Sequence, residues 1–164
     1  MAAHGAFTIR RATLDDSDGV LRCLHSAFAA YEHHYTRAAF EATTLTHESY
    51  LCRLREMMVF VAVDNSGCIV GTIACNVLAN GEGHLRGMAV VPECRATGIA
   101  NQLLACAESE LTQKNCSHIT LDTTEPLQRA MRFYERHGYR RSGKVGDFFG
   151  MPLLEFVKEL RAES

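Results

Sequence analysis

The stretch Met88-Ala-Val-Val-Pro-Glu-Cys-Arg-Ala-Thr-Gly-Ile-Ala100 decides the fold, because it passes from one type of secondary structure to another. Its first four residues are apolar and predict the end of a buried strand, which Pro92 terminates. From Gly98 to about Lys114, apolar residues recur at helical spacing and predict a helix with one buried face. The stretch is therefore a strand-to-helix junction.

The helix start at this junction predicts an anion site. Its first turn has backbone N–H groups without internal partners, and the macrodipole adds partial positive charge, so phosphate binds well there. Gly98 and Ala100 keep side chains small where an anion must approach, and Arg95 could add a charge-assisted contact. The pattern Arg-x-x-Gly-x-Ala is short, however, and is also typical of an ordinary helix start with a surface arginine.

Working outward from the junction, the apolar pattern predicts alternating strands and helices. Before the junction, the expected strands are Phe7–Ala12, Met57–Val63, Cys68–Leu78 and His84–Val91, with a helix capped by Thr13, a polar region at Tyr31–Leu45 and a helix at Thr46–Glu56. After it come a strand at His118–Thr123, a helix from Pro126 to about His137, and strands at Tyr139–Val145 and Leu153–Lys158. The expected order is β-α-α-β-β-β-α-β-α-β-β, in which Met57–Val91 forms an antiparallel meander.

Length and composition indicate one ordinary globular domain over residues 1–164. The net charge of −2, without a cationic run, gives no electrostatic reason to expect a nucleic-acid partner. No apolar run approaches the roughly 18–20 residues of a membrane helix, and the start lacks a signal-peptide pattern, so we expect a cytoplasmic protein. The seven cysteines form no Cys-x-x-Cys pair, which favours reduced thiols, and we expect no metal site.

Three separated motifs resemble the GNAT superfamily of acetyltransferases. That family's acetyl-CoA signature is Arg/Gln-x-x-Gly-x-Gly/Ala after a strand ending in Val-x-Pro, which Val90-Val-Pro-Glu-Cys-Arg-Ala-Thr-Gly-Ile-Ala100 matches in register. Ile9–Asp16 resembles the family's first strand and helix, and Ala130–Tyr139 resembles its Ala-x-x-x-Tyr-x-x-x-Gly-Phe/Tyr segment. The resemblance covers nearly the whole chain and implies an α+β fold of three layers, with a mixed, mostly antiparallel central sheet of about seven strands flanked by helices.

Two positions depart from the family pattern. Leu127 stands where the family often has an asparagine that contacts the cofactor. Ala96 replaces a frequent glycine, which is expected to cost little if the local φ is negative.

The resemblance implies an N-acetyltransferase that moves the acetyl group of acetyl-CoA directly onto an amine in a ternary complex. The strand His84–Val91 would splay from its neighbour and bind the pantetheine arm, with a backbone N–H near Met88 polarising the thioester carbonyl. The cofactor-binding residues would be Met88, Ala89, Val90, Arg95, Ala96, Thr97, Gly98, Ile99 and Ala100.

Three residues are candidates for proton transfer. Tyr134 matches the family's thiolate-facing tyrosine, although its place in an apolar helical stripe is also typical of core packing with a satisfied hydroxyl. His84, with an ordinary pKa of about 6.5, begins its strand where some members have a catalytic carboxylate, and Asp122 matches a second position used by others. The alternatives are a surface histidine beside a turn, an aspartate capping a strand end, and proton loss through water.

The resemblance implies that the acceptor lies between two lips, one containing Tyr31 and Glu32 and the other containing Phe148. The alternatives are a solvated loop at the first segment and a hairpin packed on the core at the second. A small-molecule amine is the leading candidate. A protein N-terminus or lysine is the alternative, and it would need an open groove between the lips. A non-catalytic acetyl-CoA-binding protein and a scaffold without cofactor remain open, as do monomer and homodimer.

Overall fold

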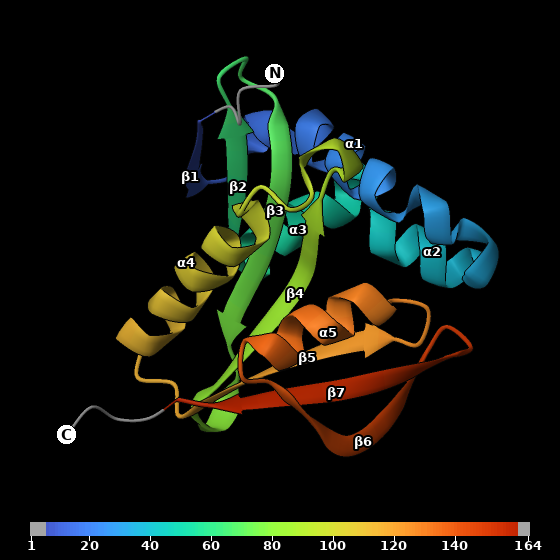
Figure 1. Cartoon of the computed structure of the whole chain (residues 1–164), viewed down its shortest axis with the longest axis vertical. Helices are drawn as coiled ribbons and strands as arrows, with labels where there is room; N and C mark the ends of the chain where they lie inside the picture. The colour runs from blue at the N-terminus through green and yellow to red at the C-terminus, as the bar shows by residue number, and fades with distance from the viewer. Residues whose placement is uncertain (1–5, 161–164) are drawn as a thin grey trace.

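The computed structural model describes residues 6–160 and contains one seven-stranded sheet (Figure 1). The strands lie in the order β1-β2-β3-β4-β5-β7-β6, and within the described residues β4 and β5 are the one parallel neighbouring pair. Their bounds are β1 Phe7–Arg11, β2 Met58–Asp64, β3 Ile69–Val77, β4 Glu82–Val90, β5 His118–Thr124, β6 Arg140–Phe148 and β7 Met151–Glu159. The predicted mixed, mostly antiparallel sheet is confirmed.

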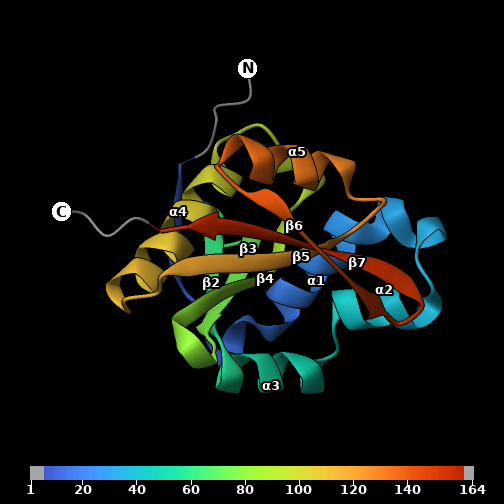
Figure 2. The same cartoon turned by 90° about the horizontal axis from the view of Figure 1, so that it is seen from below.

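Five α-helices cover the two faces of this sheet. Seen from below, α4 and α5 lie on one side and α1, α2 and α3 on the other (Figure 2). Their bounds are α1 Ser17–Phe28, α2 Arg37–Thr44, α3 His47–Glu56, α4 Ile99–Gln113 and α5 Gln128–Arg136. The three-layer arrangement is therefore also confirmed.

Each face buries its own apolar cluster. The larger cluster joins Leu103 and Leu111 of α4 and Met131 of α5 to the strands, and the smaller one joins Leu24 of α1 to the fully buried Tyr50 of α3. Since apolar burial is the main favourable term in folding, these clusters hold the helices against the sheet. They fix the positions of the strand ends that form the candidate site.

Several predicted boundaries were wrong, among them the start of the first helix, whose N-cap is Asp16 rather than Thr13, and the end of β6, which is Phe148 rather than Val145. The polar region Tyr31–Leu45 contains a helix, α2, whose N-cap Thr36 accepts a hydrogen bond from the Ala39 amide at 3.1 Å. β4 begins at Glu82, because the turn before it ends at Gly81. α5 begins at Gln128 rather than at Pro126, which lies in the preceding turn.

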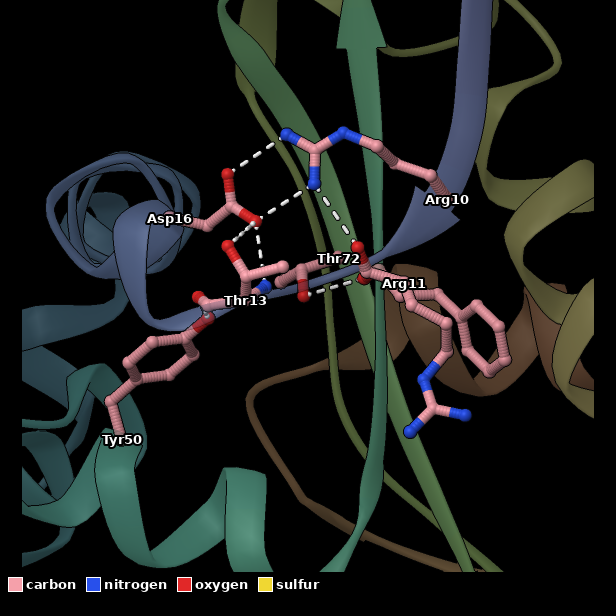
Figure 3. Close-up of polar contacts among 7 residues, drawn as sticks. Arg10, Arg11, Thr13, Asp16, Tyr50 and Thr72 are labelled. Atoms are coloured by element: carbon pink, nitrogen blue, oxygen red, sulfur yellow. Dashed lines mark hydrogen bonds and ion pairs between the residues drawn. The ribbon is translucent and has the colours of Figure 1, made fainter.

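A network of polar contacts ties β1 to the start of α1 and to α3 (Figure 3). The guanidinium of Arg10 donates two hydrogen bonds to the carboxylate of Asp16, at 2.8 and 2.9 Å. The Asp16 carboxylate also accepts a hydrogen bond from the backbone N–H of Thr13 at 2.8 Å. The backbone carbonyl of Thr13 in turn accepts a hydrogen bond from the Tyr50 hydroxyl, also at 2.8 Å. The hydrogen bonds from Arg10 and Thr13, with that of Arg10 first, lower the pKa of Asp16 to about 2.

Candidate active site

β4 and β5 separate halfway along their length. Their pairing ends at Leu85 and Leu121, whereas β4 continues to Val90 and β5 to Thr124 (Figure 1). The result is a V-shaped opening between two strands of one sheet, as the resemblance implied. Backbone groups of β4 beyond Leu85 that face β5 therefore have no strand partner on that side.

A β-bulge in β4 accompanies this separation. Ala74 of β3 faces Arg86, but Thr72 faces Ala89, so β4 holds one extra residue between them. Gly87, inside the bulge, has φ +65°, a left-handed conformation that glycine adopts readily. The bulge also shifts the alternation of side chains, so Leu85 packs in the larger cluster with α4 while Ala89 packs with α1.

The amide of Val91 donates to the carbonyl of Val70 on β3 at 2.9 Å. Successive residues of a strand direct their N–H groups to opposite edges, so the amide of Val90 faces the opening. The amide of Met88, two residues earlier, is expected to face the same way. Two of the predicted cofactor-binding residues, Met88 and Val90, thus lie on the part of β4 that extends beyond its pairing with β5, and on the other side both Ala89 and Val90 pair with β3.

The loop that follows β4 ends in a series of free amides. After a 3₁₀ turn at Pro92–Cys94 the chain enters α4 at Ile99, and Gly98, its N-cap, has φ +90°. Within residues 6–160, the backbone N–H groups of residues 96–101 have no hydrogen-bond acceptor. A Cβ built on Gly98 would meet no atom within 4 Å, so this corner is open to a ligand.

Two side chains of this loop differ from expectation. Ala96 has φ +63°, a conformation that favours glycine. The expectation that alanine costs little here assumed a negative φ, and that assumption was wrong. The guanidinium of Arg95 donates to the carbonyl of Ala27 on α1 at 3.4 Å rather than lying over the free amides. Thr97 donates its hydroxyl to the Cys94 carbonyl, which closes the turn.

Tyr134 lies in α5 with its ring buried between two aromatic neighbours. Its ring centroid is 5.4 Å from that of Phe133 and 5.7 Å from that of Tyr139. Burial raises the pKa of Tyr134 above its ordinary value, so the hydroxyl stays protonated at neutral pH. Within the described chain, Asn76 Oδ1 is the one fully buried side-chain oxygen or nitrogen that lacks a partner, so the unbonded hydroxyl of Tyr134 reaches accessible space.

His84 belongs to a hydrogen-bonded chain that fixes its tautomer. The Thr120 hydroxyl donates to a carboxylate oxygen of Glu82 at 3.0 Å, so its oxygen accepts from Nδ1–H of His84, at 2.9 Å. Nε2 of His84 therefore carries the free lone pair. His84 is the third residue of β4 and its side chain is 15% exposed, so the alternative of a surface histidine beside a turn is wrong.

The structure brings His84 and Asp122 together, although the sequence offered them as separate candidates. Nε2 of His84 lies 3.7 Å from a carboxylate oxygen of Asp122. Burial lowers the pKa of His84 and raises that of Asp122, and in each case the charge of the other residue opposes the shift. Burial dominates both shifts, so His84 rests as a neutral base whose protonated form Asp122 would stabilise.

The two predicted lips meet. The Thr36 hydroxyl donates to the Phe149 carbonyl at 2.7 Å, and the hydroxyls of Tyr35 and Thr124 lie 2.6 Å apart. A pocket of about 630 Å³ lies beside them, lined by Tyr31, His34, Thr36, Glu125, Pro126, Gln128, Gly150, Met151 and Pro152. Of the predicted acceptor residues, Tyr31 lines this pocket, whereas Glu32 is exposed and Phe148 packs against Phe149 with ring centroids 5.1 Å apart.

Sequence reasoning missed Glu82, Thr120 and Arg53 as neighbours of the site. A signal for Thr120 existed, because it alternates with the apolar Ile119 and Leu121 and so shares a strand face with Asp122. For Arg53, on α3, no sequence pattern indicates that its side chain reaches the bulge in β4.

Among residues 6–160, no helix is long and apolar enough to cross a membrane.

Both the sequence and the fold of this chain are similar to those of known proteins. The model of the acetyltransferase (GNAT) family matches residues 21–139. A GNAT-family acetyltransferase from Staphylococcus aureus superposes with a TM-score of 0.79 at 20% identity, covering 95% of this chain and 100% of that one. The PaiA N-acetyltransferase of Thermoplasma acidophilum, solved in complex with coenzyme A, gives 0.78 at 18% identity, with coverage of 94% and 99%. The ribosomal-protein-S18-alanine N-acetyltransferase of Escherichia coli gives 0.76 at 14% identity, with 97% of both chains covered.

Proposed function

This chain belongs to the acetyltransferase (GNAT) family, and on that premise we propose that it transfers the acetyl group of acetyl-CoA to a small-molecule amine. The observation that carries the proposal is the run of unbonded amides at residues 96–101, at the N-terminus of the 15-residue helix α4. Several N–H groups and the helix dipole converge there on one open corner, which suits a diphosphate. The opening between β4 and β5 leads away from that corner and would hold the rest of the cofactor.

Acetyl transfer to an amine needs a neutral amine, a polarised carbonyl and a stabilised leaving thiolate. Nε2 of His84 would accept the amine proton, and Asp122 would stabilise the imidazolium that forms. An amide at Met88 or Val90 would polarise the thioester carbonyl. The Tyr134 hydroxyl, protonated and unbonded, would donate a hydrogen bond to the thiolate.

The contact between the lips favours a small acceptor over a peptide. A peptide substrate would need an open groove, but the hydrogen bond between Thr36 and the Phe149 carbonyl bridges the two sides. Acetylation of a protein N-terminus or lysine is the alternative, and it would require the bridge to open.

Thermal unfolding with CoA tests the cofactor site. At 100 times the dissociation constant, bound CoA should stabilise the protein by about 2.7 kcal/mol. For a chain of this size we expect the unfolding temperature to rise by about 5–10 °C. No shift at any CoA concentration would contradict the proposal and leave the chain as a scaffold.

Release of free thiol in the presence of an amine panel tests the reaction itself. The panel contains amino acids, polyamines, aminoglycosides and short peptides, each incubated with acetyl-CoA. We expect thiol release with at least one small amine and slower release with peptides. CoA binding without thiol release across the panel would instead indicate a non-catalytic acetyl-CoA-binding protein.

A further inference from the structure

Arg53 reaches from α3 to the bulge in β4. A Cβ built on Gly87 would clash with Nη1 of Arg53, so the guanidinium lies directly against the glycine backbone. Gly87 follows Arg86, whose charge is the one that acts on Arg53. The two guanidinium groups therefore lie within electrostatic range of each other, where β4 leaves β5.

Neither cation forms an ion pair with a described residue, and the Asp122 carboxylate lies within electrostatic range of Arg86 only. Neither Arg53 nor Arg86 has a carboxylate within 4.0 Å in residues 6–160. Burial, and then the charge of Arg86, lower the pKa of Arg53 to about 10. Burying an unpaired charge is costly, so such groups are normally paired or hydrogen-bonded. A half-buried arginine beside a second arginine therefore points to an anion supplied from outside the fold.

The location of the pair excludes the cofactor diphosphate as that anion. Arg53 comes from α3, on the face of the sheet opposite α4 and α5 (Figure 2). Arg86 precedes Pro92 by six strand residues, which is roughly 20 Å at about 3.3 Å per residue. The diphosphate corner lies beyond Pro92, at the start of α4 and past the C-terminal end of β4, whereas Arg86 is at the middle of that strand.

The pair borders the proposed base instead. The charge of Arg86 lowers the pKa values of both His84 and Asp122, so it lies within electrostatic range of both. Arg86 and His84 are alternate residues of β4, before the bulge, and therefore share a strand face. An acceptor with its amine at Nε2 of His84 would have the two guanidinium groups beside it.

We propose that the acceptor is an amine carrying a carboxylate, such as an amino acid, whose carboxylate binds Arg53 and Arg86 while its amine faces His84. This inference rests on the proposed acetyl transfer and specifies its acceptor. The planar guanidinium forms paired hydrogen bonds with a carboxylate, and the low polarity of a half-buried site strengthens them. A phosphate could satisfy the same donors, so the experiment has to separate the two anions.

Acceptor pairs that differ only in the anionic group provide the test. Ornithine is compared with putrescine, lysine with cadaverine, tyrosine with tyramine, and phosphoethanolamine with ethanolamine. We expect kcat/KM to be about 10- to 100-fold higher for the carboxylate member of at least one pair, the effect of a charge-assisted hydrogen bond. Equal values in every pair would overturn the proposal, and a preference for phosphoethanolamine alone would replace the carboxylate with a phosphate.

Two variants test whether Arg53 and Arg86 cause the preference for a carboxylate acceptor. Arg53→Gln and Arg86→Gln should raise KM for the carboxylate acceptor about 10- to 100-fold, leave KM for acetyl-CoA unchanged, and abolish the difference within a pair. Arg55→Gln, on the exposed side of the same helix, is the matched control and should change none of these values. Unchanged selectivity in both variants would overturn the proposal.

Stability and binding measurements keep the result interpretable. Arg53→Gln removes an unpaired, half-buried charge, so its unfolding temperature should equal or exceed that of the unmodified protein. If it fails to fold, the exposed Arg86 still gives a usable variant. The rise in unfolding temperature when the preferred amino acid is added to the CoA-bound protein measures binding at the anion site without any acetyl transfer. Amines acetylated without carboxylate preference would refute this inference and leave the proposed function intact, whereas CoA binding without acetylation of any amine would refute the function.

Discussion

Two arginines in this molecule have opposite surroundings. Arg10 donates two hydrogen bonds to Asp16, and this contact raises the pKa of Arg10. Arg53 has no carboxylate partner in the described chain, and burial lowers its pKa to about 10. Arg10 stabilises the fold through a partner that the chain supplies, whereas Arg53 carries a charge whose partner must come from elsewhere.

The same contrast extends to the regions around them. In the network of β1, α1 and α3, the polar groups bond to one another (Figure 3). At the candidate site, the amides of residues 96–101 before and at the start of α4 remain unbonded, as does the Tyr134 hydroxyl. Substitutions in the first region should therefore change stability, and those in the second should change binding or turnover.

The largest effect is expected at Gly98. Gly98→Val places a branched side chain where the free amides meet a diphosphate, and we expect CoA affinity to fall roughly 1,000-fold through the loss of several charge-assisted bonds. Calorimetric titration with CoA measures it. Gly67→Val is the matched control, because Gly67 also has positive φ and open space but lies in the turn between β2 and β3. Equal affinity in the two variants would show that the amides do not form the diphosphate site.

His84→Gln should lower kcat/KM about 100-fold, the contribution of a general base. Burial places the pKa of His84 below 6.5, and the base must be unprotonated to act. The rate of the unmodified protein should therefore hold through neutral pH and fall only as the pH drops below that lowered pKa. In the variant this acid limb should disappear, and a pH profile of kcat/KM that keeps it would assign the base to another group.

Tyr134→Phe should lower kcat about 10-fold, because it removes one hydrogen bond to a charged leaving group. Stability should hardly change, since the hydroxyl has no protein partner to lose. Single-turnover kinetics, with thermal unfolding as the control, separate the two quantities. Full turnover in the variant would return Tyr134 to a packing role.

In the paired region, Asp16→Asn should lower the free energy of unfolding by about 1–2 kcal/mol, since the pKa of Asp16 is about 2 and Arg10 is half exposed. Because the folded pKa lies below the ordinary 3.8, the contribution is present above pH 3.8 and lost as the pH falls through about 2. Urea unfolding at pH 7 and at pH 2 measures both. Turnover per folded molecule should not change, and a loss of turnover would break the distinction between the two regions.

The smallest effect is expected at Ala96, whose φ of +63° is costly for a residue with a Cβ. Ala96→Gly should stabilise the protein by about 0.5 kcal/mol, because the greater freedom of glycine in the unfolded chain offsets part of the gain. Urea unfolding is the measurement. A loss of stability would show that the loop adopts another conformation in solution.

The sequence was sufficient for features that depend on local pattern. Apolar spacing around Pro92 predicts the strand, the turn and α4, and the helix predicted at Thr46–Glu56 matches α3 to within one residue. It was insufficient for features that depend on tertiary approach. The contact between His84 and Asp122 requires the register of β4 and β5, and the reach of Arg53 requires the bulge at Gly87.

Two local features were also missed. α2 was overlooked because it is only 8 residues long and, apart from Phe40, its apolar residues are alanines, although Thr36 supplies an ordinary N-cap. The sign of φ at Ala96 could not be read from the residue type, because alanine strongly prefers negative φ and the turn overrides that preference.

The extra residue in β4 has a consequence for how this protein can diversify. Because it reverses the alternation within one strand, two positions that are two residues apart serve opposite faces of the sheet. Arg86 acts on Arg53 of α3, and Met88 packs against the cluster around α4. The distance between the acceptor and acetyl-CoA is then set by the backbone of β4 and does not depend on how the helices pack on either face of the sheet. Substitutions on α3 can alter which amine is chosen without disturbing the cofactor, but a one-residue deletion in this strand would misalign both at once.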